Sequence, residues 1–222
     1  MRINKLLLLG GIISLLMIAS CTDDEADNTP PPSSNDTTTD TVGTFIDNRD
    51  NKEYHWIKIG NQTWMVENLA FKVDTGGCWA YNDDENNVET YGYLYNWWTA
   101  NAVAPEGWHL ATNSEWQVLI DYLGGEYYAG GKLKEEGTAH WLSPNTGATN
   151  VSGFTALPGG RRNEGSNNLY THLTYYGYWW TATPYTNSST TAYARYLYND
   201  SKEATIYGQQ KEDAFSVKCI RD

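Results

Sequence analysis

Basic residues are scarce in this sequence. The 222 residues include 15 Lys and Arg against 27 Asp and Glu, and the formal net charge at pH 7 is −12. Proteins that bind nucleic acid draw most of their affinity from Lys and Arg contacts to phosphate, and this acidic sequence lacks a basic patch. The composition therefore argues against nucleic acid as a partner.

Motifs that would fix a catalytic nucleophile are also missing. No Gly-x-Ser-x-Gly segment accompanies His109, His140 or His172, and histidines scattered among aromatic residues are more often packed or solvated than catalytic. Cysteine is rare, and the two that follow residue 43, Cys78 and Cys219, are far apart in the sequence. We therefore predict that the protein is not an enzyme.

Long hydrophobic runs are limited to residues 6–19, and this run is shorter than the roughly 20 residues of a membrane-spanning helix. Two basic residues precede it, and it ends in Ile18-Ala19-Ser20-Cys21, which resembles the lipobox of bacterial lipoproteins. We predict a lipoprotein signal peptide over residues 1–20, with Cys21 lipidated as the anchor in the membrane. A plain secretory signal with a chance cysteine is the alternative.

Residues 21–43 contain six acidic residues and no basic one, and we predict that they form a disordered linker. Residues 22–25 resemble an acidic signal that exports some bacterial lipoproteins to the outer face of the outer membrane. Asp36-Thr37-Thr38 and Asp40-Thr41-Val42 resemble a short O-glycosylation sequon. These segments predict a lipid-anchored protein of the outer membrane, exposed at the cell surface. An ordinary solvated linker is the alternative.

The globular domain is predicted over residues 44–222. The 10 Trp, 17 Tyr and 20 Gly of the chain indicate an aromatic core and frequent turns. Residues 54–59 and 62–66 flank a Gly-Asn pair that tolerates positive φ, which predicts a hairpin. From residue 177 onward, short runs rich in Tyr, Trp, Thr and Val predict three or four antiparallel strands, the last over residues 215–220.

Two helices are predicted before those strands. Thr112 and Glu115 have the spacing of a capping box, and apolar residues follow at helical spacing until Gly124-Gly125 ends the helix. A shorter helix is predicted over residues 93–101, with its inner side formed by Leu94, Trp97 and Trp98. Helices early and strands late indicate an α+β domain.

Seven segments of the domain are recognisable together: KIGNQTWMVENL (58–69), YGYLYNW (91–97), GWHLATNSEW (107–116), GGKLKE (130–135), NVSGFTALPGGRR (150–162), GYWWTAT (177–183) and FSVKCIRD (215–222). They resemble the Fibrobacter succinogenes major paralogous domain, and the resemblance covers nearly all of residues 46–222. It implies a C-type-lectin-like fold, related to that of formylglycine-generating enzymes, with two main helices, short antiparallel strands and many loops. It also implies a secreted or lipid-anchored bacterial protein.

The resemblance extends to single residues. Six tryptophans inside these segments are expected in the core: Trp64, Trp97, Trp108, Trp116, Trp179 and Trp180. Arg161 and Arg162 are expected to tie the domain's own loops together, although such a pair can also clamp a carboxylate. Many relatives carry further cysteines that this chain lacks. Without them, Cys78 and Cys219 either form a disulfide or remain buried thiols.

An acidic loop at residues 82–87 concentrates oxygen ligands of the kind that calcium prefers. Its order lacks the alternation of an EF-hand, and Trp180 is followed by Thr181-Ala182 rather than by the Asn-Asp of sugar-binding C-type lectins. We assign no metal and no cofactor to the chain. Calcium in this loop is the alternative to a solvated loop.

The most unusual composition lies in residues 181–213, where 22 of 33 positions are Thr, Ala, Tyr, Ser, Asn or Asp. Antibody binding loops favour similar residues, because Tyr offers a large amphipathic surface at small entropy cost and Ser and Asn supply adaptable hydrogen bonds. We predict a ligand-binding face made of eight residues: Tyr185, Asn187, Tyr193, Tyr196, Tyr198, Asn199, Asp200 and Tyr207. The segment also resembles the part of C-type-lectin-like proteins that diversity-generating retroelements vary. An ordinary polar hairpin is the alternative.

Together these features predict a cell-surface lipoprotein whose domain presents a ligand-binding face to a protein or a glycan. Carbohydrate recognition by exposed Tyr or Trp rings is one alternative. A second is an enzyme of the formylglycine-generating type, which would need a pair of reactive cysteines or a thiolate-held copper ion. A third is a passive structural component of the cell surface.

Overall fold

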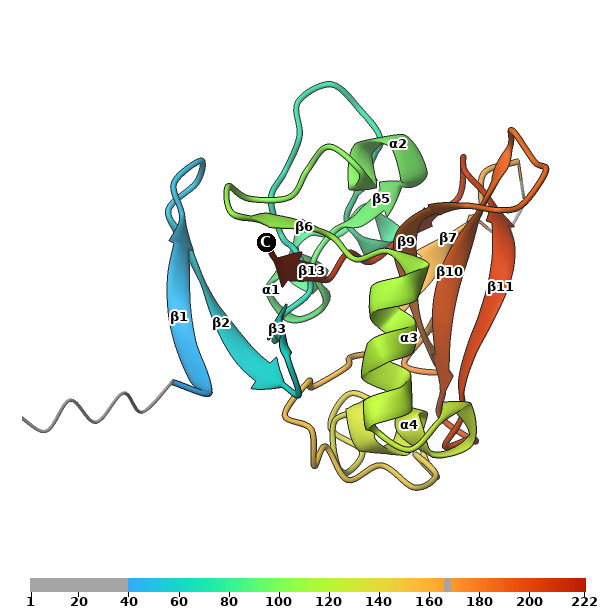
Figure 1. Ribbon diagram of the computed structural model, residues 1–222. Coiled ribbons are helices and arrows are strands. Elements are labelled where there is room, and N and C mark those ends of the chain that lie inside the picture. Colours follow the sequence, from blue (N-terminus) through green and yellow to red (C-terminus); the bar gives the residue numbers. More distant parts are fainter. Residues whose placement is uncertain (1–39, 166–168) are drawn as a thin grey trace, which may run out of the picture. The chain divides into compact units, whose positions relative to one another are not determined.

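The computed structural model describes residues 40–165 and 169–222 of the chain. The predicted signal peptide, the lipidation site Cys21 and the linker up to residue 39 lie outside these residues. Strands outnumber helices, and they pair antiparallel, so the domain is α+β (Figure 1). In the part of the chain that the structure describes, no helix is both long and apolar enough to span a membrane.

The first sheet contains the predicted hairpin. Strands β2 (Lys52–Ile59) and β3 (Gln62–Met65) pair antiparallel around Gly60, whose φ of 61° suits glycine at this turn. The sheet has the order β1-β2-β3-β13-β6, and its other strands are β1 (Val42–Asp47), β13 (Cys219–Arg221) and β6 (Trp108–Leu110). The hairpin prediction is confirmed. Because β1 begins at Val42, the last two residues of the predicted linker already belong to the folded domain.

Two further sheets form the rest of the domain. One has the order β4-β5-β12-β7-β8, with β4 (Cys78–Trp79), β5 (Leu94–Asn96), β12 (Ala214–Phe215), β7 (Gly159–Arg162) and β8 (Tyr170–Leu173). The other has the order β11-β10-β9, with β9 (Tyr176–Pro184), β10 (Thr191–Tyr198) and β11 (Ala204–Gln210). The two sheets meet where Ser216 pairs with Trp179 of β9. This junction places the C-terminal part of the chain against the three-stranded sheet.

The longest helix is the one that the capping box predicts. In α3 (Asn113–Tyr122), the Thr112 side chain accepts from the Glu115 backbone and the Glu115 carboxylate accepts from the Thr112 backbone. Gly124, with φ of 98°, follows its last turn. The second helix, α4 (Glu126–Leu133), follows at once, and both pack against one face of the β9-β10-β11 sheet (Figure 1).

The predicted helix over residues 93–101 is mostly wrong. Residues 94–96 form β5, and the Asn96 side chain caps the four-residue helix α2 (Trp97–Ala100) that follows. Trp98 is 49% exposed rather than on an inner side. The second main helix is α4 instead. The sequence pattern did not predict this helix because Gly130 and Gly131 lie inside it. Both positions require glycine, because a larger residue would collide with a neighbouring backbone: a Cβ at Gly130 would lie 2.1 Å from the Glu203 carbonyl oxygen.

The predicted last strand over residues 215–220 is split between two sheets. Phe215 ends β12, whereas Cys219 begins β13 in the first sheet. Between them, Lys218 is buried, and its Nζ donates to the backbone carbonyls of Val66 and Phe154. These contacts are available only where the chain passes from one sheet to the other, and a run of strand-forming residues does not reveal them.

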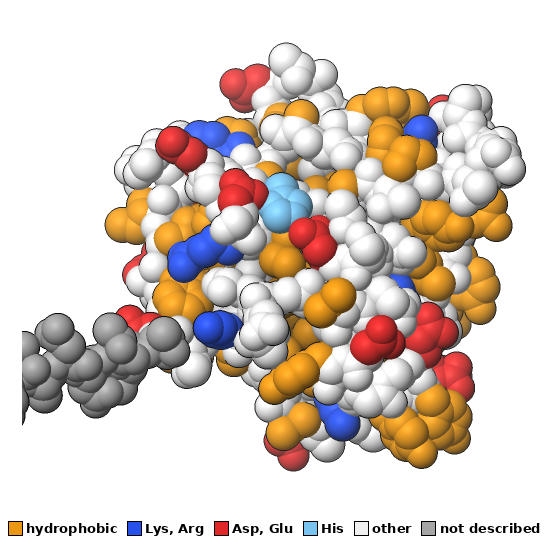
Figure 2. Space-filling view, in the orientation of Figure 1, with side chains coloured by type: hydrophobic (Ala, Val, Ile, Leu, Met, Phe, Trp, Pro, Cys, Tyr) orange, Lys and Arg blue, Asp and Glu red, His pale blue; other side chains and the backbone are white. Residues whose placement is uncertain are grey.

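The core consists largely of aromatic rings. Trp64, Trp108, Trp116, Trp179 and Trp180 are at most 7% exposed, so the core prediction is confirmed for them. Trp97 is half-buried, with its indole N–H donated to the Thr181 carbonyl. The remaining short helices lie at the edge of this core and are η1 (Tyr81–Asp83), η2 (Glu85–Asn87) and α1 (Val88–Tyr91). On the surface drawn in Figure 2, basic side chains are dispersed rather than gathered in a patch.

Candidate ligand-binding site

The eight residues predicted to bind a ligand lie in three separate places. Tyr185, Asn187 and Tyr193 lie at the tip of the β9-β10 hairpin, where the rings of Tyr185 and Tyr193 are 4.8 Å apart. The Tyr185 ring covers Gly208, because a Cβ at that glycine would lie 2.5 Å from it. Since Gly208 alternates along β11 with Tyr207, the tip residues and Tyr207 lie on opposite faces of the sheet.

Asn199 and Asp200 form the second place, at the turn between β10 and β11. Asn199 is only 7% exposed, and its side-chain amide donates to the Ser143 carbonyl. Its backbone carbonyl accepts from Thr146 N–H. Asn199 therefore ties two loops together. Its prediction as a surface contact is corrected, because these loop carbonyls come from a distant part of the sequence.

The third place is the side of the β9-β10-β11 sheet that faces away from α3 and α4, and we call it the tyrosine face. It comprises Tyr176, Tyr178, Tyr196, Tyr198 and Tyr207. Antiparallel register puts Tyr196 opposite Tyr178 and Tyr198 opposite Tyr176, and the ring centroids of both pairs are 4.8 Å apart. Tyr207 of β11 is 5.4 Å from Tyr196 and is 54% exposed.

Two members of the tyrosine face, Tyr176 and Tyr178, were not among the predicted residues. The signal was present in the sequence as the same Tyr-x-Tyr spacing in both strands, at residues 176–178 and 196–198. A period of two places both tyrosines of each strand on one side of the sheet. Only the antiparallel register, which the tertiary structure provides, shows that the two pairs face each other.

Tyr196 lies at the floor of this face. It is 5% exposed, which corrects its prediction as a surface contact, and burial raises its pKa far above the usual range. Within the described residues its hydroxyl has no hydrogen-bond partner, in contrast to the hydroxyls of Tyr178 and Tyr198, which bond to His172 Nδ1 and Thr205 Oγ1. Leaving such a group unpaired costs about 1–3 kcal/mol.

Arg161 of β7 forms part of the rim of the tyrosine face. Its guanidinium lies 5.5 Å from the centre of the Tyr178 ring. The Nε donates to Thr171 Oγ1 at 3.4 Å and Nη1 to Gln209 Oε1 at 3.5 Å, so both contacts are long and both acceptors are neutral. The expected loop-tying role suits the neighbouring Arg162 better, because Arg162 forms an ion pair with Glu164 and stacks on Trp79.

His172 of β8 completes the rim. Its φ of 68° is unusual for a residue other than glycine and costs about 1–3 kcal/mol of backbone strain. Its ring stacks on Tyr176 at 4.6 Å, and burial together with the Arg161 charge lowers its pKa, which favours the neutral imidazole. The ring also borders an open hollow of about 380 Å³ that Tyr170 and Tyr175 help to line. His172 therefore borders both the hollow and the tyrosine face.

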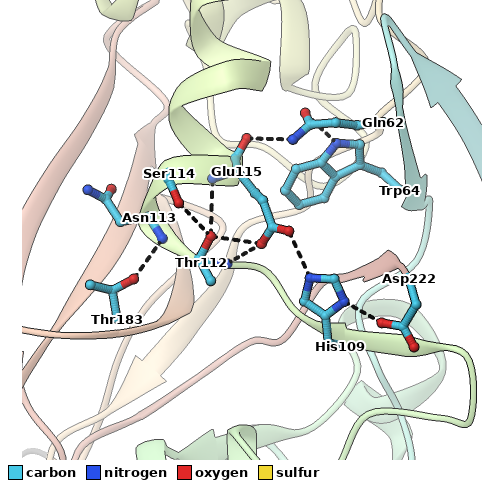
Figure 3. Close-up of polar contacts among 9 residues, drawn as sticks. All are labelled: Gln62, Trp64, His109, Thr112, Asn113, Ser114, Glu115, Thr183 and Asp222. Carbon is cyan, nitrogen blue, oxygen red and sulfur yellow. Dashed lines mark hydrogen bonds and ion pairs between the residues drawn. The ribbon is translucent and has the colours of Figure 1, made fainter.

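His109 belongs to a different network, at the junction of β6, β13 and α3 (Figure 3). Its Nδ1 lies 2.6 Å from an Asp222 oxygen and its Nε2 lies 2.9 Å from a Glu115 oxygen. The hydrogen bonds to these carboxylates raise its pKa against the effect of burial. With both nitrogens engaged by carboxylates, His109 links the C-terminal residue to α3 and has no nitrogen available as a general base.

The other histidines also lack a nucleophile partner. His140 Nδ1 contacts the Glu135 carboxylate, and His172 contacts the Tyr178 hydroxyl. In residues 40–165 and 169–222, no Ser, Thr or Cys side chain is hydrogen-bonded to a histidine. The structure therefore does not assemble the three histidines that the sequence offered for catalysis into one site.

The acidic loop at residues 82–87 directs its carboxylates to different partners. Asp83 accepts from the Tyr170 hydroxyl, Asp84 caps the backbone of Asn86, and Glu85 binds Lys72 and the Tyr93 hydroxyl. Within the described residues, no group of three or more His, Cys, Asp or Glu is arranged to hold a metal ion. The loop carboxylates serve the packing of their surroundings.

Cys78 and Cys219 are free thiols in the structure; Cys219 is buried, as the second of the two predicted states has it, whereas Cys78 is half-buried. Burial raises the pKa of Cys78 to about 11 and that of Cys219 to about 12. A thiol reacts as its thiolate, so these values make both cysteines poor nucleophiles at neutral pH.

The fold and this site define an α+β domain with five tyrosines on one side of a three-stranded sheet, from the buried Tyr178 and Tyr196 to the exposed Tyr207. Residues 57–221 match the family described as the Fibrobacter succinogenes major domain. The chain therefore belongs to this family. Comparisons with curated proteins and with solved structures gave no match.

Proposed function

We propose that the protein is a ligand-binding lipoprotein of the bacterial cell surface and that its ligand binds on the tyrosine face. Cys21 carries the lipid anchor in the outer membrane, residues 21–41 act as the tether, and the C-type-lectin-like domain carries the binding site. The observation that carries this proposal is the cluster of five tyrosines on one side of the β9-β10-β11 sheet, with the buried and unpaired hydroxyl of Tyr196 beneath it.

The surroundings of the tyrosine face suit binding because they hold it rigid. Trp179 and Leu197, which point to the other side of the same strands, are at most 2% exposed and pack with residues of α3 and α4. Tyrosine side chains lose little rotamer entropy on binding, and a face that is already ordered keeps this cost small.

Diversification by a retroelement is the finer form of this proposal. Within residues 181–213, the exposed positions include 185–187, 189–190, 200, 207, 210 and 212, whereas Ala192, Ala194 and Arg195 are buried. A diversified receptor should vary at exposed codons and keep buried ones. Sequencing the locus in several isolates would test this. Adenine-linked changes at the exposed codons and a nearby template repeat would support diversification, and a constant segment without a repeat would refute it.

Catalysis of the formylglycine-generating type has less physical support than binding. Both thiols of the described domain have raised pKa values, Cys219 is buried and Cys78 is half-buried, and the histidines lie in separate networks. A recognition function requires only an accessible and ordered surface. If Cys78→Ser or Cys219→Ser abolished an oxidase activity of the purified protein, or if it bound copper, the enzyme alternative would replace the proposal.

The direct test is a binding screen with a matched pair of variants. The full chain, purified in detergent, is applied to a glycan array and to a phage-displayed peptide library. We expect Tyr207→Ala to reduce binding of the selected ligand at least about tenfold, the loss of one aromatic anchor. Tyr127→Ala is the control, because Tyr127 lies on α4, beyond the opposite face of the sheet, and is 56% exposed, close to the 54% of Tyr207. Equal binding by both variants would contradict the proposal.

A further inference from the structure

Arg161 has unused capacity to bind an anion. An arginine has five N–H donors, and the side chain of Arg161 uses two of them, in contacts of 3.4 and 3.5 Å to neutral oxygens. Within the described residues no carboxylate lies within 4.0 Å of it, whereas Arg49, Arg162 and Arg195 each have one. Arg221 shares this lack among the described residues, but its guanidinium lies over the rings of Trp56 and Trp108.

The position of this arginine links it to the tyrosine face. Arg161 is half-buried, its guanidinium lies over Tyr178, and its Nη1 reaches across to Gln209 of β11. The Tyr178 ring that Arg161 covers is in turn 4.8 Å from the Tyr196 ring, centroid to centroid. The unpaired donors of Arg161 and the unpaired hydroxyl of Tyr196 thus belong to the same small region.

Asp213 does not neutralise Arg161 by contact, because no ion pair joins them in the described residues. Asp213 is 8% exposed, and one of its oxygens accepts from the Glu164 backbone N–H. Burial raises the pKa of Asp213, and the Arg161 charge acts in the opposite direction. Asp213 therefore forms no ion pair with Arg161. The N–H groups of the Arg161 guanidinium remain open to a ligand.

We propose that Arg161 binds the carboxylate of an acidic saccharide whose sugar ring stacks on the exposed Tyr207 of the same face. A guanidinium matches a carboxylate with two parallel hydrogen bonds. Tyr207 and the half-buried Tyr198 offer flat ring surfaces, while Gln209 and Thr171 offer neutral partners for sugar hydroxyls. This inference rests on the proposed function, since it names the ligand class of the tyrosine face.

The chemistry of the rim favours a sugar over an acidic peptide. The rim around Arg161 presents amide, hydroxyl and phenol groups, which suit the several hydroxyls of a sugar. Sugars present a ring of hydroxyls on one plane and C–H groups on the other, which suits alternating polar groups and aromatic faces. Binding of acidic peptides is therefore an outcome that the experiment must be able to reveal.

The experiment uses pairs of ligands that differ only in charge. Oligosaccharides of galacturonate, glucuronate and sialic acid are titrated against the full chain in detergent, each beside its methyl ester. We expect at least one acid to bind about tenfold more tightly than its ester, the difference expected for one charge-assisted contact. Arg161→Gln should reduce this preference to less than about twofold, and Arg161→Lys should leave an intermediate preference, because lysine keeps the charge and loses the paired donors.

Arg221→Gln is the matched control. Arg221 also lacks a carboxylate within 4.0 Å among the described residues, but it lies between Trp56 and Trp108 in the first sheet. It should keep the full preference for the acid. Equal binding of acids and esters, binding of acidic peptides alone, a preference that survives Arg161→Gln, or no saccharide binding would each overturn the inference. In these cases the Tyr207→Ala test still decides the proposed function, because it does not depend on the charge of the ligand.

Discussion

The two faces of the β9-β10-β11 sheet contain similar residues that differ in their contacts. On the helix face, the buried Arg195 contacts Glu126, Asn113 and Gln117 from α3 and α4. On the tyrosine face, Arg161 contacts only neutral oxygens at 3.4 and 3.5 Å. The Arg195 guanidinium is held by one carboxylate and two side-chain amides, whereas the Arg161 guanidinium has only two long contacts to neutral groups. The comparison therefore separates structural from functional residues by their partners and not by their type.

The largest difference between the faces should appear when one aromatic ring is removed from each. Trp179 is fully buried on the helix face, and its indole N–H donates to Asn68 Oδ1 at 2.8 Å. We expect Trp179→Ala to reduce the free energy of unfolding by about 3–5 kcal/mol. Tyr207→Ala should reduce it by less than about 1 kcal/mol, because that ring is 54% exposed. Urea unfolding followed by circular dichroism measures both. Similar losses would mean that the tyrosine face is part of the core.

A smaller difference is expected for the two arginines. Arg195→Gln leaves Asn113 and Gln117 without their donor, and we expect a loss of about 2–3 kcal/mol in unfolding free energy. Arg161→Gln should change it by less than about 0.5 kcal/mol, since its contacts are long and its acceptors reach solvent. Unfolding of both variants under one condition gives the comparison. A large loss for Arg161→Gln would assign that arginine to the fold.

The helix face also predicts a pH dependence. Lys134 is fully buried at the end of α4, its Nζ donates to the Tyr198 and Ser201 carbonyls, and burial lowers its pKa to about 8 from 10.5. Between these values the unfolded chain holds a proton that the folded chain has lost, so the Lys134 contribution to stability should rise with pH, by at most about 1.4 kcal/mol per pH unit.

Lys134→Met removes this group and provides the control. The unfolding free energy of the wild type minus that of Lys134→Met should increase from pH 8 to pH 10. Arg161→Gln, on the other face, should show the wild-type pH dependence. A difference between wild type and Lys134→Met that is flat over this range would show that the amine stays protonated in the folded protein.

The smallest effect is expected in the first sheet, outside both faces. The pKa of His109 is raised by Glu115 and Asp222, so its ion pairs contribute stability that is full below the unfolded pKa of about 6.5 and is lost as the pH rises through the folded pKa. Since 38% of the His109 side chain is exposed, we expect less than about 1 kcal/mol. An NMR titration of the imidazole in wild type, with His109→Gln as the stability control, tests this. A folded pKa at or below 6.5 would contradict it.

Local signals in the sequence predicted the local parts of the fold. The capping box at Thr112 and Glu115 satisfies the first backbone groups of a helix from within four residues, so it forms independently of distant parts. The hairpin around Gly60 likewise depends on one turn. Residues 93–101 have an equally helical pattern, but Leu94 and Tyr95 form a strand that pairs with β4 and β12. Strand β12 lies far away in the sequence.

Local signals in the sequence likewise predicted only part of the candidate site, because the rest depends on contacts between distant segments. Composition identified residues 181–213 as unusual, and Tyr198 and Tyr207 do lie on one accessible face. Composition did not show that the Asn199 side chain donates to a loop carbonyl or that Tyr196 is buried, because both facts depend on neighbours from other segments. Arg161 and His172 joined the site only through the register of β7 and β8 beside this sheet.

The sequence by itself determined the acidic composition, the aromatic core, the local helix and hairpin, and the membership of the family that residues 57–221 match. Short-range spacing and side-chain chemistry are sufficient for these properties. The tertiary structure alone decided which tyrosines share a face, which arginine keeps its donors unpaired and which polar residues are buried. Each of these depends on contacts between segments that are distant in the chain, and those contacts form only when the three sheets are assembled.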